Sequence, residues 1–239
     1  MASPYSTGGG GTHFEARVAA TYLAAALCEA PARGLPGWSA HEIRAQRAKD
    51  GDPLDDLVVT GTLANGQASK LSLQVKTDIA FSSSNADWQA VVAAAWDTCA
   101  APGFDVGCHR IGVAIANYNA NVDKYYQSVL TWAANSASGA DFMGRIQTKD
   151  FAHAEKRVFV QGIQSIITSH MGRLATDDEL WRFLSSFVIL HFDLNLDNDR
   201  SRDEASAIDR LGLCARPWRG FVMTVVCKVK VGGRASHAR

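Results

Sequence analysis

The sequence lacks several features that would assign a protein to a class at once. Its five cysteines are scattered, odd in number and without a C-x-x-C pair, which argues against a disulfide framework and a zinc site. No apolar run approaches the roughly 20 residues that a membrane-spanning helix needs. No basic segment followed by an apolar one, as in a secretory signal, opens the chain. These absences predict a cytoplasmic protein that does not engage a membrane.

An excess of either charge is also missing, because 24 Lys and Arg balance 24 Asp and Glu. A nucleic-acid-binding protein of this balance must separate its charges locally. This chain does so near its C-terminus, where residues 193–209 carry six acids and residues 216–239 carry six basic residues and no acid. A solvated helix followed by a basic tail explains this pattern without a dedicated DNA groove.

A nucleotide-binding loop is absent too. The run of glycines within residues 1–12 has no Gly-Lys-Ser/Thr after it, so it predicts a flexible lead-in and no phosphate cradle. The composition, 47% hydrophobic and 20% charged, is ordinary for a globular chain with a sizeable core.

The sequence does contain a polar group of residues on a short β-hairpin. Two segments with apolar alternation, about 56–63 and 69–76, flank a turn at Asn65-Gly66. Because side chains alternate faces along a strand, Gln74 and Lys76 share one face, and the apolar residues between them turn to the core.

An acid at the head of one strand, with an amide and a lysine on its neighbour, suits metal-dependent phosphodiester cleavage. Oxygen ligands hold a divalent cation, which activates water, and the lysine steadies the nucleophile or the developing negative charge. We therefore predict Asp56, Gln74 and Lys76 as catalytic residues, the first two as ligands of Mg²⁺ or Mn²⁺.

Two hairpin registers are open. A three-residue loop with Gly66 in the left-handed region places Asp56 opposite Gln74, whereas a two-residue turn places Asp55 opposite Lys76. A slip of one residue moves every side chain to the other face. We favour Asp56, because the first register sets acid and amide directly across from each other, and keep Asp55 as the alternative ligand.

The expected elements around the hairpin follow the order helix, strand, strand, strand, helix, strand. The helices fall at about 13–30 and 86–100, and the outer strands at 38–46 and 110–116. The remainder is expected to be mostly helical, with these segments: helices at 125–134, 150–170, 177–188 and 204–211, and a strand-like stretch at 189–194.

This element order, with Asp56 before Gln74-Val75-Lys76, resembles the PD-(D/E)xK nuclease superfamily in its Mrr-like Gln-x-Lys branch. The Pro-Asp pair is missing, since Pro53 is followed by Leu54. The resemblance implies an α/β fold: a restriction-endonuclease-like αβββαβ core with a mostly helical C-terminal extension. The corresponding regions are a lead-in at 1–12, the core at 13–117, the extension at 118–215 and a basic tail or truncated linker at 216–239.

A narrower resemblance rests on the segments HFEARVAATYLAAAL, DDLVV, LSLQVK and FLSSFVILHFDLN. Over roughly residues 8–215 they look like the N-terminal double-stranded-DNA endonuclease domain of bacterial antiphage effectors, namely CBASS effectors with a SAVED domain and Avs STAND NTPases. This implies a DNA endonuclease that works as a homo-oligomer with a sensor domain or partner protein absent from this chain. It also implies Glu15 as a further metal ligand; locally, a capping box with Thr12 would account for Glu15 equally well.

Other interpretations are weaker. A non-catalytic nucleic-acid-binding or assembly module on the same fold is the main alternative, and an interaction domain for a sensor protein, docking through the acidic and basic C-terminal blocks, is a third. A cysteine nucleophile at Cys99 with His109 is disfavoured, because no third orienting residue can be identified.

Overall fold

The computed structural model describes these residues: 10–35, 37–45, 53–54, 56–63, 65–117, 119–148, 152–194, Ser206 and Asp209. The alternative ligand Asp55 and the basic tail at 216–239 lie outside the described residues. So do most of the acidic block and most of the helix expected at 204–211.

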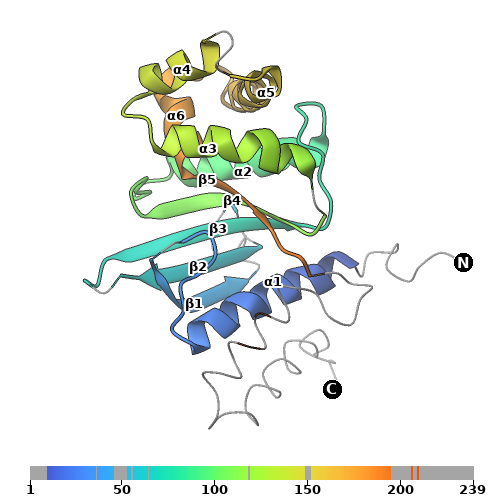
Figure 1. Cartoon of the computed structure of the whole chain (residues 1–239), viewed down its shortest axis with the longest axis vertical. Helices are drawn as coiled ribbons and strands as arrows, with labels where there is room; N and C mark the ends of the chain where they lie inside the picture. Colours follow the sequence, from blue (N-terminus) through green and yellow to red (C-terminus); the bar gives the residue numbers. More distant parts are fainter. Residues whose placement is uncertain are drawn as a thin grey trace, which may run out of the picture.

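The protein is α/β, with a mixed sheet of five strands in the order β1-β2-β3-β4-β5 (Figure 1). β1, β2 and β3 are antiparallel neighbours, and β4 and β5 continue the sheet parallel to β3. The C-terminal ends of β3, β4 and β5 therefore lie on the same side of the sheet as the N-terminal end of β2. The strand bounds are Ser39–Ala45, Leu57–Thr62, Ala68–Lys76, His109–Ile115 and Phe187–His191.

Helices cover both faces of the sheet. α1 lies on one face, and α2 to α6 lie on the other (Figure 1). The helix bounds are α1 Gly10–Leu27, α2 Ala86–Ala100, α3 Gln127–Ala134, α4 Gly139–Gln147, α5 Ala154–Met171 and α6 Asp177–Ser186, with a π-helical turn η3 at Val122–Tyr126. None of the helices in the described ranges combines the length and apolar character that a bilayer crossing requires.

The face under α1 buries a small apolar core. Phe14, Val18 and Tyr22, spaced along one side of α1, pack with Leu71 and Leu73 of β3, and all five are at most 1% exposed. This spacing is that of an amphipathic helix on a sheet, and it accounts for the position of α1.

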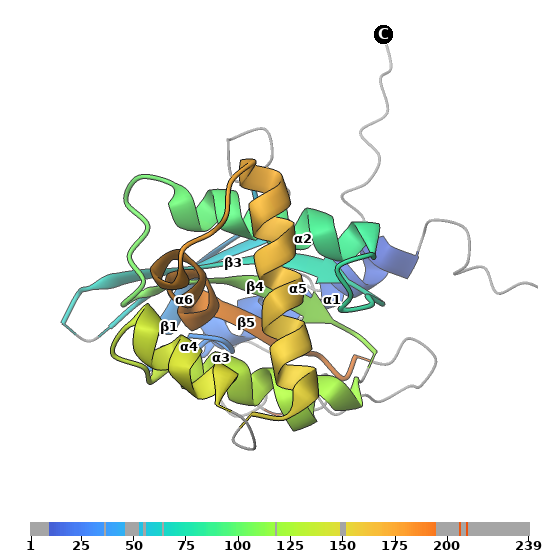
Figure 2. The ribbon, with the colours of Figure 1, turned by 90° about the horizontal axis from the view of Figure 1, so that it is seen from above.

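The opposite face buries a larger core around Trp88 of α2. The Trp88 ring is 1% exposed and lies against Phe81, Phe159 of α5 and Phe187 of β5. Figure 2 shows α5 running across α2 and α3, which lie between it and the sheet. The helices that follow β4 therefore share one core with α2 and the sheet.

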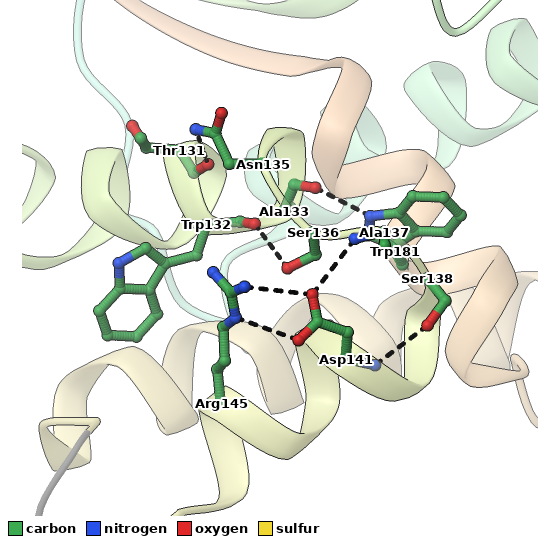
Figure 3. Close-up of polar contacts among 10 residues, drawn as sticks. All are labelled: Thr131, Trp132, Ala133, Asn135, Ser136, Ala137, Ser138, Asp141, Arg145 and Trp181. Carbon is green, nitrogen blue, oxygen red and sulfur yellow. Dashed lines mark hydrogen bonds and ion pairs between the residues drawn. The ribbon is translucent and has the colours of Figure 1, made fainter.

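Polar contacts hold α3, α4 and α6 together at one corner of this layer (Figure 3). Ser138 caps α4 by accepting from the Asp141 N–H, and Asp141 accepts from the Ala137 N–H. From α6, the indole N–H of Trp181 donates to the carbonyl oxygen of Ala133 at the end of α3, at 2.8 Å. The first two contacts shape the start of α4, a helix that the sequence did not predict, and the third joins α6 to α3.

The order of elements expected for residues 13–117 is observed, and α2 has the expected bounds. α1 begins earlier than expected, at Gly10, so Thr12 lies inside the helix and not at its N-cap position. The strand-like stretch expected at 189–194 becomes β5, shifted toward the N-terminus, and it extends the same sheet.

Candidate functional site

The turn of the β2–β3 hairpin decides which side chains meet. Gly66 has φ +83°, and its N–H donates to the carbonyl oxygen of Leu63 at 2.9 Å. The Leu63 N–H in turn donates to the Gln67 carbonyl at 3.0 Å. The loop therefore has the three residues of the favoured register, with Gly66 left-handed.

This register brings the predicted acid and amide together. Leu57 pairs with Leu73 in the ladder, so the preceding residue, Asp56, lies across from Gln74. Asp56 Oδ2 accepts hydrogen bonds from Gln74 Nε2 and from the Val75 N–H, the latter at 2.8 Å. Because β2 pairs only from Leu57 onward, the carboxylate takes a backbone donor beyond the end of the ladder. Asp56 thus continues the hydrogen bonding of β3 beyond the β2–β3 ladder, and it also fixes the Gln74 side chain.

Lys76 follows on the same face of β3. Its Nζ lies 3.9 Å from Oδ1 of Asp87, in the first turn of α2. The Lys76 side chain is 32% exposed and that of Asp87 is 68% exposed. The ammonium group therefore stands at the solvent-facing rim of the sheet, between the strand end and the start of α2.

The neighbouring strand β4 borders this site with apolar residues. In the parallel ladder Gln74 pairs with Val113 and Lys76 with Ile115, two buried residues of β4. A polar row on β3 thus runs beside an apolar row on β4, and the polar groups lie at the margin of the larger core. Charged and hydrogen-bonding groups in such a position interact more strongly than groups surrounded by water.

Glu15 lies on α1, which covers the other face of the sheet. The chain reverses direction between α1 and β1, and Figure 1 shows the first residues of α1 at the edge where β3 ends. Glu15 therefore comes from the helix on the face of Leu71 and Leu73, opposite to the face that carries Gln74 and Lys76.

In the described residues, no three His, Cys, Asp or Glu side chains gather in a way that could hold a metal ion. The set at the strand end combines one acid, Asp56, with an amide and an amine. Asp87 carries no motif in the sequence; only its place 11 residues after Lys76, at the start of the next helix, could have drawn attention to it.

The cysteine and histidine candidates have other surroundings. Burial raises the pKa of the Cys99 thiol to about 11, so the thiolate needed for a nucleophile is scarce at neutral pH. His109 Nδ1 accepts from the Asp105 N–H at 3.2 Å, and His191 Nε2 contacts the Ala116 carbonyl at 3.0 Å. His109 thus takes part in a local loop contact, and His191 links the end of β5 to the residue after β4.

Comparison with protein-family models, with curated proteins and with solved structures gives no match to this chain.

Proposed function

We propose that this chain is a metal-dependent endonuclease that hydrolyses double-stranded DNA, on a restriction-endonuclease-like core formed by α1, β1, β2, β3, α2 and β4. The observation that carries the proposal is the meeting of Asp56 and Gln74 across the hairpin, with Lys76 next on the same face. An acid, an amide and an amine at one half-buried strand end match the donor and charge requirements of phosphodiester cleavage.

The donor set fits a hard divalent cation such as Mg²⁺ or Mn²⁺. The Asp56 carboxylate and the Gln74 amide oxygen are ligand types that such ions prefer. In the structure Gln74 directs its Nε2 toward Asp56, so ligation through Oε1 needs the amide to turn about its last torsion, which is soft. A cation held there would supply Lewis acidity and an activated water. We propose Glu15, approaching from α1, as a further ligand.

The remaining roles fall to residues of β3. In this proposal the Lys76 ammonium offsets the charge of a phosphate beside Asp56 and orients the attacking water. With Gln74 in place of a second acid, the pair carries only one negative charge and would hold a cation weakly by itself. A phosphate oxygen from DNA therefore helps to complete the ligand set.

Cleavage of supercoiled plasmid in Mg²⁺ or Mn²⁺ tests this proposal. We expect the wild type to nick or linearise the plasmid, and Asp56→Asn and Lys76→Ala to lose activity by about a hundredfold or more. Lys70→Ala is the matched control, because Lys70 lies on the same strand and face, six residues before Lys76. Absence of cleavage by the wild type, or full cleavage by Lys76→Ala, would refute the enzyme.

A second candidate, a non-catalytic module that binds nucleic acid, is favoured by one observation. The bonds from Gln74 and Val75 to Asp56 already give this carboxylate a structural role as the end of β2. Such a module would retain DNA without metal, with an affinity that falls steeply as salt rises. Gel-shift measurements in EDTA at two salt concentrations distinguish it from the enzyme, whose DNA binding is expected to gain from Ca²⁺.

The wider setting of the proposal comes from sequence resemblance alone. We propose an effector role in antiphage defence in the cytoplasm, with a sensor domain or partner protein that triggers assembly into a homo-oligomer. Mass photometry with and without DNA, paired with the plasmid assay, tests whether cleavage accompanies assembly.

A further inference from the structure

Asp87 brings a second carboxylate to the strand end that carries Asp56, Gln74 and Lys76. Its Oδ1 lies 3.9 Å from Lys76 Nζ, and it comes from α2 and not from the hairpin. The ammonium group of Lys76 thus has an acidic neighbour on the helix side, while Gln74, two residues earlier on the same face, bonds to Asp56. The lysine side chain has four rotatable bonds, so an ion pair with a neighbouring carboxylate helps to hold its ammonium group in one orientation.

The position of Asp87 is fixed by strong local contacts. Asn85 caps α2 by accepting from the Trp88 N–H at 2.8 Å, and the Trp88 ring is buried in the aromatic cluster described above. Asp87 lies between these two anchored residues. Its backbone therefore has little freedom to move relative to the sheet.

The link between Lys76 and α2 is held as well. The Asn117 N–H donates to the carbonyl oxygen of Thr77 at 3.1 Å, which ties the end of β3 to the end of β4. Ile79 is buried in the larger core, and the side-chain amide of Gln89 donates to the Ser83 carbonyl at 2.6 Å. Both partners of the Lys76–Asp87 pair are thus carried on backbone that the fold holds in place.

We infer that Asp87 is a positioning residue of the proposed active site, which orients the Lys76 ammonium toward the phosphate beside Asp56. The inference rests on the proposed function and extends it to a residue outside the strand motif. A carboxylate that acts through Lys76 affects the rate of the chemical step more than the binding of DNA.

The first test separates rate from binding. Asp87→Asn is expected to lower kcat about tenfold or more while KM stays within about twofold, and Asp87→Glu to recover most of the lost rate. Asp177→Asn is the matched control, because Asp177 is an exposed acid in the first turn of another helix, α6. An Asp87→Asn variant as active as Asp177→Asn would overturn the inference and leave the proposed nuclease standing.

The second test measures the chemical reactivity of Lys76 and does not depend on nuclease activity. Brief acylation of the folded protein, followed by peptide mass spectrometry, reports how readily each amine reacts. Loss of the ion pair in Asp87→Asn should raise acylation of Lys76 at least about twofold and leave Lys70 unchanged, because a side chain no longer held against the carboxylate at 3.9 Å samples more solvent-exposed rotamers. Unchanged Lys76 labelling would overturn the inference, and a wild type that fails to cut DNA would overturn it together with the proposed function.

Discussion

At the scale of single residues, Glu179 illustrates how the surroundings of one carboxylate can be converted into a testable property. In the capping box of α6, the Glu179 carboxylate accepts from the Thr176 N–H at 2.9 Å and is bound by both terminal nitrogens of Arg173. The Arg173 hydrogen bonds, and then that of Thr176, lower the pKa of Glu179 to about 2. The ionised form of this carboxylate is therefore more stable in the folded state than in the unfolded state.

The sign of the pH dependence follows from this difference. The pKa of Glu179 falls from 4.5 to about 2 on folding, so its stabilising contribution is complete above pH 4.5 and is lost as the pH drops toward 2. Glu179→Gln should lower the free energy of unfolding by about 1 kcal/mol at pH 7. The difference in stability between variant and wild type should narrow below pH 4.5 and vanish near pH 2.

Urea denaturation followed by circular dichroism at pH 7, 4.5 and 3 measures this convergence. Glu155→Gln, which removes an acid from the first turn of α5, controls for the loss of a helix-end charge. A constant gap between Glu179→Gln and the wild type at all three pH values would contradict the expected linkage.

At the scale of elements, the β2–β3 turn determines which face of the sheet carries Asp56. Gly66 has φ +83° and open space around the position of a Cβ atom, so a side chain there is opposed by the backbone alone. Gly66→Ala should therefore lower the free energy of unfolding by about 1 kcal/mol.

Gly144→Ala is the matched control for this prediction. Gly144 lies within α4, where a Cβ would also meet nothing within 4 Å, and alanine there should stabilise by about 0.5–1 kcal/mol. Chemical denaturation of both variants gives the comparison. A Gly66→Ala variant at least as stable as the wild type would indicate that the turn does not require a left-handed residue.

Local rules explain which elements the sequence could predict. Asn85 as N-cap and the apolar spacing around Trp88 mark α2, and Asn65-Gly66 with alternating leucines marks the hairpin. Each of these signals is made of residues that are close together in the sequence. α4 was missed because contacts distant in the chain position it. One such contact is the bond from the Gly139 N–H to Asp178 of α6, at 2.9 Å.

The candidate site likewise contains one contact that the sequence could predict and one that it could not. The meeting of Asp56 and Gln74 follows from strand alternation and one loop length, so it was predictable. The approach of Asp87 to Lys76 depends on the angle at which α2 leaves the sheet, which is set by packing of Trp88 against rings from α5 and β5. No local pattern encodes that angle.

At the scale of the whole molecule, the elements that follow β4 complete the core that supports the candidate site. Trp88 of α2 packs on Phe159 and Phe187, both far beyond residue 117 in the chain. β5 pairs with β4 along its length, and α3, α5 and α6 contribute to the same apolar cluster. Residues 13–117 therefore have one face covered by α1, and a second face that α2 covers only in part and that depends on the rest of the chain for the remainder.

A fragment of residues 1–117 should consequently fail to fold, whereas a fragment of residues 1–194 should fold cooperatively. Loss of the partners of a buried tryptophan or phenylalanine costs about 3–5 kcal/mol each, and a domain has only about 5–15 kcal/mol of stability in total. Uncovering Trp88, Ile111 and Val113 together, each at most 1% exposed, exceeds that margin. Urea titrations followed by far-UV circular dichroism and tryptophan fluorescence should give coincident transitions for residues 1–194 and no cooperative transition for residues 1–117. A cooperative transition in the shorter fragment would show that the first four strands fold without β5 and its helices, and that the candidate site needs only the core around α1.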